Sequence, residues 1–215
     1  MTSRLKLFKN LVADFKKDKS IDGVLLSGSV ACGTATEYSD LDIIVLGKEN
    51  KFVSSVIDGI TVEVHYITFS KAIAKLNANP MEVYRYLDAV IEYDNGRLQE
   101  IIDCANEIYN SFNIDEKEKK EIFYWLGSTK SKLNSALLNN DELLISYLVS
   151  INTWKVLEGM WAVNHKPVPP ASSLYRRYND LKNVPFDGWF ERLMTGSTES
   201  RAKAMIETIE WILTN

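Results

Sequence analysis

Two short runs of aliphatic residues, at 24–26 and 43–46, most constrain the fold of this chain. Runs of this length without polar alternation are typical of strands that are covered on both faces. A polar stretch separates the two runs and ends with Asp40 and Asp42, directly before the second one. The sequence therefore predicts a buried sheet in the first part of the chain, with two carboxylates where one of its strands begins.

Further elements of the first part follow from local patterns. Residues 61–68 alternate between polar and β-branched or aromatic residues, and the Asp58-Gly59 pair predicts a hairpin turn back from 52–57. A helix is expected over 70–79, ending before a proline, and a short strand with an Asn95-Gly96 turn follows. The first twenty residues predict an amphipathic helix rather than a signal peptide, because basic residues interrupt their apolar positions.

The second part of the chain has a helical pattern throughout. Asp115 with Glu118 three residues later resembles a capping box, and the helix it starts carries leucines and isoleucines at helical spacing. A second helix is predicted at 141–164, followed by a proline-rich loop. Shorter helices are predicted near 172–182, 186–194 and 198–213. Four aromatic residues at helical spacing are expected in the core of this part: Trp125, Tyr147, Trp154 and Trp161.

Charge and composition narrow the classes of partner. The net charge is −4 and the pI is about 5.4, so no basic field would hold a long nucleic acid, and a small cationic substrate fits the sign better. The longest uncharged apolar run, 143–154, is too short to span a membrane. Cys32 and Cys104 lie far apart and predict no zinc site, while a disulfide between them stays open. We expect a cytoplasmic protein.

The two aspartates suit metal binding. Residues two apart on a strand point to the same face, roughly 6–7 Å apart at Cα. Carboxylates at that spacing can share a pair of Mg²⁺ ions, the arrangement used in phosphoryl and nucleotidyl transfer. Glu63 supplies a third carboxylate in an otherwise apolar strand, where an unpaired charge would be costly. A bound metal would explain all three residues.

Gly28 and Ser29 follow the first aliphatic run and suit phosphate binding. Backbone N–H groups at such a turn can bind phosphate oxygens, glycine allows a close approach, and the serine adds a hydroxyl. The stretch is neither a Walker A loop nor a dinucleotide-binding glycine motif. Alone, the glycine could simply end a strand, and an isolated Asp-x-Asp could be a turn. Together with the third carboxylate, the combination is much more specific than its parts.

The combination of the Gly-Ser turn and the Asp-x-Asp pattern resembles that of a known family. LLSGSVACGTATEYSDLDIIV is similar to the signature of the nucleotidyltransferase superfamily, the DNA polymerase β-like fold, in which a Gly-Ser pair precedes Asp-x-Asp. The length and the helical second half make the chain most similar to the antibiotic nucleotidyltransferases of the kanamycin, streptomycin and lincosamide type and to their uncharacterised relatives. Two positions depart from many relatives: Cys32 stands where an arginine is usual, and Glu63 stands where an aspartate is usual.

The resemblance implies an α+β architecture. A nucleotidyltransferase catalytic domain at 1–112, a mixed sheet flanked by helices, would be followed by an all-α substrate-binding bundle at 113–215. It also implies two Mg²⁺ ions held by Asp40, Asp42 and Glu63. A nucleoside triphosphate, with ATP favoured, would be bound by Gly28, Ser29, Asp40 and Asp42. The hydroxyl of a small molecule held between the two halves, an antibiotic being one candidate, would attack the α-phosphate and release pyrophosphate.

Several further residues are candidates for the chemistry. Glu158 could be a general base from the helical half, or the partner of Lys155 in an i,i+3 ion pair. His65 should lie on the same face of its strand as Glu63. Which of Glu63, His65 and Glu158 acts as the general base stays open. Three cationic residues could contact the triphosphate or serve only solubility: Lys130, Arg176 and Arg177.

Two other functions remain as alternatives. The chain could be an antitoxin-like nucleotidyltransferase that modifies a partner protein, although such proteins tend to be one short domain and this chain has a helical second half. It could also be a nucleotide-binding module without catalysis, which the full set of carboxylates disfavours. The acceptor, the base preference and the presence of a homodimer are not encoded in any of these patterns.

Overall fold

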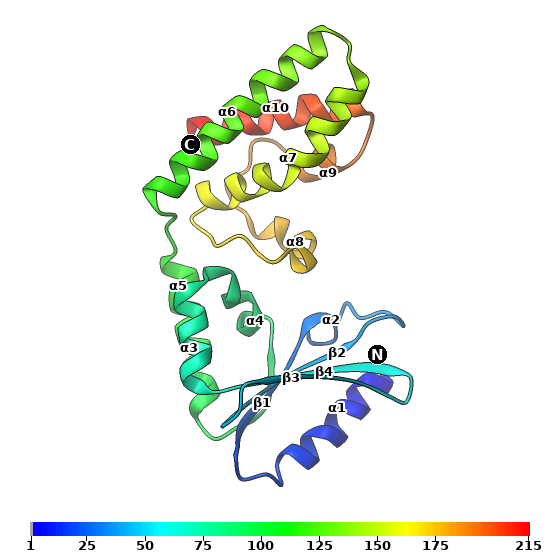
Figure 1. Ribbon diagram of the computed structural model, residues 1–215, viewed down its shortest axis with the longest axis vertical. Coiled ribbons are helices and arrows are strands. Elements are labelled where there is room, and N and C mark those ends of the chain that lie inside the picture. The colour runs from blue at the N-terminus through cyan, green and yellow to red at the C-terminus, as the bar shows by residue number, and fades with distance from the viewer. Residues whose placement is uncertain (1) are drawn as a thin grey trace. The chain divides into compact units, whose positions relative to one another are not determined.

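The computed structural model describes residues 2–215, which form two compact units that meet in sequence between Asn110 and Ser111. The N-terminal unit contains the sheet and its covering helices, and the C-terminal unit is built from helices (Figure 1). None of the helices within residues 2–215 is long and apolar enough to cross a membrane. The expected α+β fold, with a sheet domain followed by a helical region, is confirmed.

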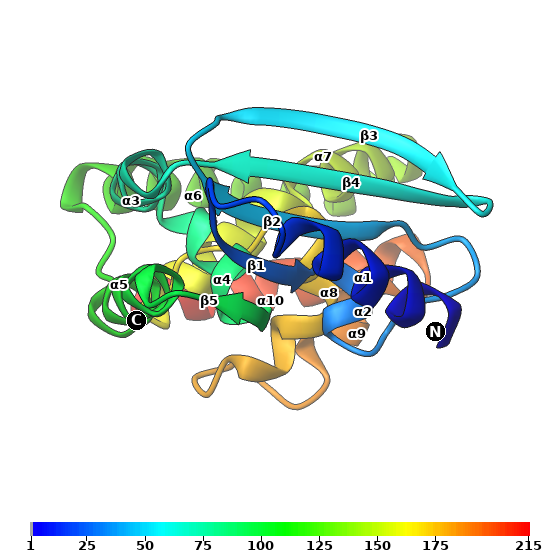
Figure 2. The same cartoon turned by 90° about the horizontal axis from the view of Figure 1, so that it is seen from below.

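The sheet of the N-terminal unit is mixed. Its strands are β1 (Ile21–Ser27), β2 (Leu41–Gly47), β3 (Lys51–Ile57), β4 (Ile60–Ile67) and β5 (Val90–Asp94). They lie in the order β3-β4-β2-β1-β5, as Figure 2 shows. The β2 and β4 strands pair in parallel, and every other neighbouring pair is antiparallel. The β3–β4 hairpin turns at Asp58 and Gly59, both with positive φ, so the predicted turn is confirmed.

Helices cover both faces of the central strands, which explains the aliphatic runs. The amphipathic helix α1 (Thr2–Phe15) packs Phe8 and Val12 against one face. The opposite face is covered by α3 (Phe69–Ala78), α4 (Val83–Leu87) and α5 (Arg97–Ser111). Residues that alternate along β1 and β2 therefore enter two different cores. The β3 strand lies at the edge of the sheet, and nearly all of its residues are exposed.

Two helices of this unit, the short α4 and the longer α5, were not predicted. The Asn95-Gly96 turn is present, but it leads directly into α5. The side chain of Asp94 accepts hydrogen bonds from the backbone N–H groups of Gly96 and Leu98, each at 2.9 Å. A third bond comes from the N–H of Gln99, at 3.2 Å. Asp94 thus satisfies the free N–H groups at the start of a helix, a role that its position at the end of a strand conceals in the sequence.

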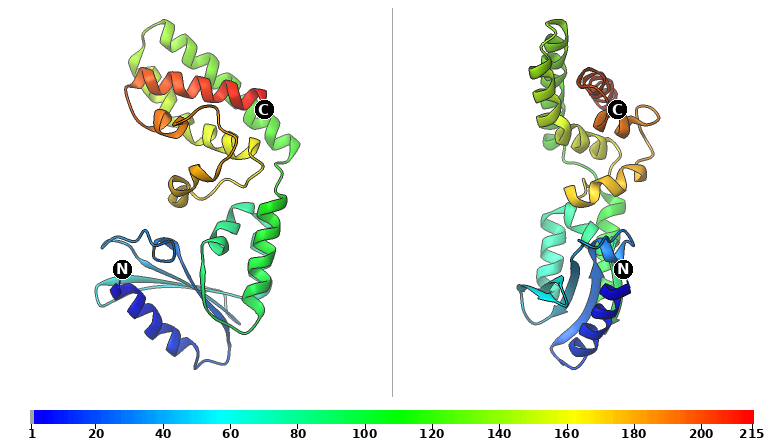
Figure 3. Two further views of the ribbon diagram at one scale, coloured as in Figure 1. Left: turned by 180° about the vertical axis from the view of Figure 1, so that it is seen from behind. Right: turned by 90° about the vertical axis from the view of Figure 1, so that its right-hand side faces the viewer.

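The C-terminal unit is formed around three long helices. These are α6 (Glu116–Leu138), α7 (Glu142–Val163) and α10 (Thr198–Thr214), which pack on one another (Figure 3). The shorter α8 (Ala171–Arg177), η2 (Tyr178–Asp180) and α9 (Trp189–Met194) connect α7 to α10. Asp115 caps α6 as predicted, accepting from the N–H groups of Lys117 and Glu118. At Gly159 the three helices approach so closely that a Cβ would lie 2.9 Å from Leu126 Cδ1.

The aromatic residues of this unit are less buried than expected. Trp161 is 1% exposed, but Trp125 and Tyr147 are 52% and 58% exposed, so the prediction that they belong to the core was wrong. The indole N–H of Trp125 donates to Asn152 Oδ1 at 2.8 Å. A tryptophan near the surface can keep its ring on apolar neighbours while its N–H reaches a polar group, which helical spacing alone does not reveal.

Candidate metal centre

The sheet register places the predicted carboxylates side by side. Ser27 of β1 pairs with Asp42 of β2, and Asp42 pairs with Glu63 of β4. Residues opposite one another in neighbouring strands project to the same face, so Asp42 and Glu63 share a face. Asp40 lies directly before β2. One carboxylate oxygen from each of Asp40, Asp42 and Glu63 lies within 4.8 Å of the others, and all three residues are half-buried.

Electrostatic repulsion within this triad favours a cation. Burial, together with the negative charges of Asp40 and Glu63, raises the pKa of Asp42 to about 6, while Arg85 acts in the opposite direction. Three carboxylates offer only oxygen ligands, which Mg²⁺ and other hard divalent cations prefer. The residues therefore fit a divalent-metal site, because an ion held there would neutralise charges that now repel one another.

The Gly28 turn packs its backbone directly against the triad. Gly28 has φ +67°, and a Cβ built on it would lie 1.9 Å from Asp42 Oδ2. Glycine is required on both counts, since its backbone is left-handed and no side chain fits. The one-turn helix α2 (Gly28–Ala31) follows. The hydroxyl of Ser29 is buried and has no hydrogen-bond partner among residues 2–215, so it can bond to a ligand.

Arg4 positions the loop that carries Asp40, a role that sequence reasoning missed. Its side chain is only 7% exposed. Its Nε donates to the carbonyl oxygen of Ser39 at 2.7 Å, and its Nη2 donates to that of Glu37 at 2.6 Å. Because both acceptors are backbone groups distant in sequence, no residue pattern could have indicated them.

Cys32, where many relatives carry an arginine, ends α2 as a free, half-buried thiol, and Cys104 is also free.

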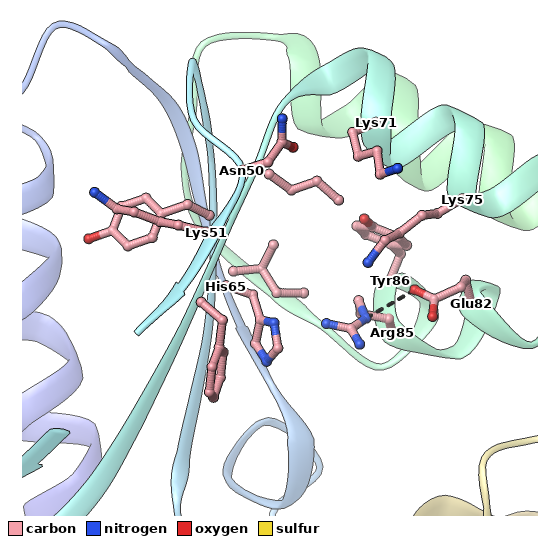
Figure 4. A pocket seen from close by; sticks show the side chains of 12 residues that line it. Asn50, Lys51, His65, Lys71, Lys75, Glu82, Arg85 and Tyr86 are labelled. Atoms are coloured by element: carbon pink, nitrogen blue, oxygen red, sulfur yellow. Dashed lines mark ion pairs between the residues drawn. The ribbon is translucent and has the colours of Figure 1, made fainter. Parts of the chain in front are cut away.

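His65 lies beside the triad on the same face of β4 as Glu63. Its ring contacts Phe52, with a centroid distance of 4.6 Å. Burial lowers the pKa of His65 below its usual range, and the charges of Arg85 and Lys75 act in the same direction. The imidazole is therefore neutral near pH 7 and able to accept a proton. It also lines a cavity of ≈ 190 Å³ next to α3 and α4 (Figure 4).

Glu158 lies in the C-terminal unit and is not part of the triad. Its Oε1 accepts a hydrogen bond from Trp154 Nε1 at 2.6 Å, and its carboxylate forms an ion pair with Lys155. This is the i,i+3 pair considered above, and a role as general base stays a prediction. Two of the candidate triphosphate contacts also have acidic partners: Lys130 with Glu210 at 3.4 Å, and Arg177 with Asp180 at 2.8 Å.

Comparison with known proteins identifies the family. The nucleotidyltransferase domain family matches residues 8–130, which is more than half of the chain and includes the whole sheet and the triad. The chain belongs to the nucleotidyltransferase domain family. The match of this nucleotidyltransferase domain continues into α6. Members of the family are mostly catalytic.

Among solved structures, the chain is similar to a nucleotidyltransferase-like protein from Exiguobacterium sibiricum 255-15, known from a crystal structure at 1.90 Å resolution. The two sequences are 12% identical, and the alignment covers 96% of this chain and 73% of that chain with a TM-score of 0.43. No curated protein matches the sequence.

Proposed function

We propose that this protein is a Mg²⁺-dependent nucleotidyltransferase that moves a nucleoside monophosphate, AMP from ATP, to a hydroxyl of a small molecule and releases pyrophosphate. The observation that carries the proposal is the triad of Asp40, Asp42 and Glu63, whose oxygens lie within 4.8 Å of one another, with the Gly28 backbone packed against Asp42. Three carboxylates beside a glycine turn suit a substrate with phosphate groups, because the carboxylates can bind divalent metal ions and the turn can bind phosphate oxygens.

Each element of the site has a distinct part in this proposal. Asp40, Asp42 and Glu63 hold two Mg²⁺ ions, which when bound supply charge neutralisation at the phosphates and lower the pKa of the attacking hydroxyl. The backbone N–H of Gly28 and the free hydroxyl of Ser29 hold phosphate oxygens. Arg4 keeps Asp40 in place through the loop carbonyls. The main task of the protein is to position these groups before the reaction begins.

The reaction also needs a group that takes a proton. As the acceptor oxygen bonds to the α-phosphorus, the bond from that phosphorus to pyrophosphate breaks and the hydroxyl loses its proton. Glu63 and the neutral His65 share one face of β4 and are both candidates. Glu158 of the helical unit is a third. An antibiotic acceptor is supported only by the length and the helical second half that this chain shares with enzymes of that class.

Pyrophosphate release tests the proposal directly. The protein is incubated with Mg²⁺ and each nucleoside triphosphate, with a panel of hydroxyl compounds that includes aminoglycosides, lincosamides and sugar phosphates. We expect release that requires an acceptor and is reduced at least about hundredfold in Asp42→Asn, because that variant loses a metal ligand. Nucleotide binding without release for any acceptor would contradict the small-molecule transferase and favour a protein acceptor or a binding-only role.

A further inference from the structure

A small cavity lies on the same face of the sheet as the triad. It is lined by residues of β2, β3 and β4 together with α3, α4 and the short turn Pro80–Glu82 before α4, all within the N-terminal unit, and its volume is ≈ 190 Å³ (Figure 4). Sites for drug-sized ligands are roughly 300–1,000 Å³. The cavity is therefore suited to one small group of a larger substrate rather than to a whole nucleotide.

Three cationic side chains converge on this cavity. The ammonium groups of Lys71 and Lys75, on successive turns of α3, and the guanidinium of Arg85 point into the same space (Figure 4). Glu82 is the acidic residue of the lining, and it pairs with Arg85 at 3.3 Å. The cavity thus has a clear excess of positive charge.

A fourth cationic residue of the lining, Lys51, does not add to this excess of positive charge. Its ammonium group pairs with Glu49 and lies over the ring of Tyr66, 4.5 Å from the centroid. Figure 4 shows it on the far side of the sheet from the other cations. The positive charge of the cavity therefore comes from α3 and α4.

The charge of Lys71 and Lys75 is uncompensated. Like charges four residues apart on a helix destabilise it, and within residues 2–215 neither lysine lies within ion-pair distance of a carboxylate. Tyr86 also lines the cavity, and burial raises its pKa to about 12, so its hydroxyl stays protonated as a hydrogen-bond donor. Cations and donors gathered in this way match an anion with several oxygen atoms.

The cavity and the Gly28 turn lie on opposite flanks of the triad. The turn follows β1, on one side of β2, whereas His65 of β4, on the other side of β2, lines the cavity. Arg85 lies close enough to the triad to lower the pKa of Asp42. If the turn holds the triphosphate, as proposed above, the cavity is on the side from which an acceptor would approach.

We infer that this cavity binds an oxyanionic group, a phosphate or a carboxylate, carried by the hydroxyl acceptor. The inference rests on the proposed transferase function and narrows its substrate class. It also departs from the expectation of a cationic substrate, which followed from net charge alone. Lys71 and Lys75 are the binding residues, and Arg85, held by Glu82, orients the anion toward the triad.

The test is an amide NMR titration of the full chain with inorganic phosphate at constant ionic strength, without Mg²⁺ or nucleotide. We expect shifts concentrated in α3 and α4, and an affinity at least about tenfold lower in Lys71→Gln/Lys75→Gln, because two charged hydrogen-bond donors are lost. Both lysines are exposed, so the variant should fold. The matched control is Lys9→Gln/Lys19→Gln, which removes the same charge from exposed positions in and next to α1 and should change affinity less than about twofold.

A second measurement separates the acceptor from the nucleotide. A non-hydrolysable ATP analogue with Mg²⁺ should bind Lys71→Gln/Lys75→Gln within about twofold of the wild-type affinity, because the triphosphate contacts the turn on the other flank. Loss of phosphate binding with intact analogue binding supports the inference. Equal weakening by both double variants, absence of phosphate binding to the wild type, or parallel loss of analogue binding would each overturn it. Because the titration needs no turnover, it can succeed or fail independently of the transferase assay.

Discussion

At the scale of single residues, Gly28 is the position where the backbone itself is part of the site. A positive φ commonly explains why a position is occupied by glycine, and Gly33, five residues later, has a similar φ of +72°. Only at Gly28 does the missing side chain also make room for a carboxylate. At Gly33 a Cβ would meet nothing within 4 Å. The two glycines therefore separate backbone strain from the closeness of the turn to Asp42.

Substitution of these glycines should give different results. Gly33→Ala should lower the free energy of unfolding by about 1–2 kcal/mol, the cost of a left-handed alanine. Gly28→Ala should lower it by about 3 kcal/mol or more, since the new methyl group also displaces Asp42. Pyrophosphate release should fall about hundredfold only in Gly28→Ala. Urea denaturation and the release assay measure both effects, and similar losses in the two variants would contradict the role of Gly28.

Single residues also show where sequence reasoning ended. Gly28, Asp40, Asp42 and Glu63 could be proposed as candidates because chemistry fixes both their type and their spacing, and the structure brings the three carboxylates together. Arg4 could not, because its partners are backbone carbonyls that any residue supplies. An arginine in an amphipathic helix has no feature that marks it as buried, and only the path of the folded loop brings it there.

At the scale of elements, the triad is a property of the sheet. Asp42 and Glu63 meet because β2 and β4 pair in parallel register. Burial, together with the charges of Asp40 and Glu63, raises the pKa of Asp42 from 3.8 to about 6. Below the lower value, Asp42 is protonated in both the folded and the unfolded protein. Above the higher value it is ionised in both, and the folded state contains the repulsion. Without metal, the stability contributed by this group is therefore present at low pH and lost as pH rises through about 6.

We expect Asp42→Asn to remove this pH dependence. In the presence of a chelator at pH 8, the variant should be more stable than the wild type by about 1 kcal/mol, since partial solvent access screens the repulsion. At pH 3.5 the difference should disappear. Saturating Mg²⁺ should stabilise the wild type but not the variant.

Urea denaturation at the two pH values measures these differences. Glu37→Gln, which neutralises an exposed carboxylate outside the triad, serves as the control. If Asp42→Asn proved less stable than the wild type at both pH values, the repulsion inferred here would be absent.

The elements themselves were predicted unevenly. Strands β1, β2 and β4 were found because their aliphatic or alternating patterns are dictated by the cores on each face. Helix α5 was missed because Asp94 serves both as the last residue of β5 and as the cap of the helix, so the local pattern indicates only a turn. Exposure of Trp125 was missed because a helix pattern gives spacing but not the position of neighbouring helices.

At the scale of the whole molecule, the chain has separate cores in its two units. The C-terminal core gathers α6, α7 and α10, and the N-terminal cores lie on the two faces of the sheet. The acceptor was not predicted from the sequence. Lys71, Lys75 and Arg85 belong to two helices, and only the folded arrangement shows that they converge.

Glu158 tests whether the helical unit takes part in catalysis. An acid–base role requires Glu158→Gln to lower turnover by about 10²–10⁴-fold while nucleotide affinity stays unchanged. The matched variant Lys155→Gln breaks the same ion pair but keeps the carboxylate, and it should retain turnover. Steady-state kinetics and nucleotide titration of both variants test this role. Small and equal effects of the two substitutions on turnover would show that the Lys155–Glu158 ion pair is only structural.

The parallel pairing of β2 with β4 also sets an order of events during synthesis. The hairpin arm β3 lies between these strands in sequence but outside them in the sheet. A ribosome must therefore release the whole hairpin before Glu63 can reach Asp42. Until then the growing chain contains two aspartates but no three-carboxylate cluster. The β4 strand, which adds Glu63 to the two aspartates, also places Val62 and Val64 in the core beneath them. The third carboxylate and the apolar side chains that stabilise its strand are therefore synthesised together.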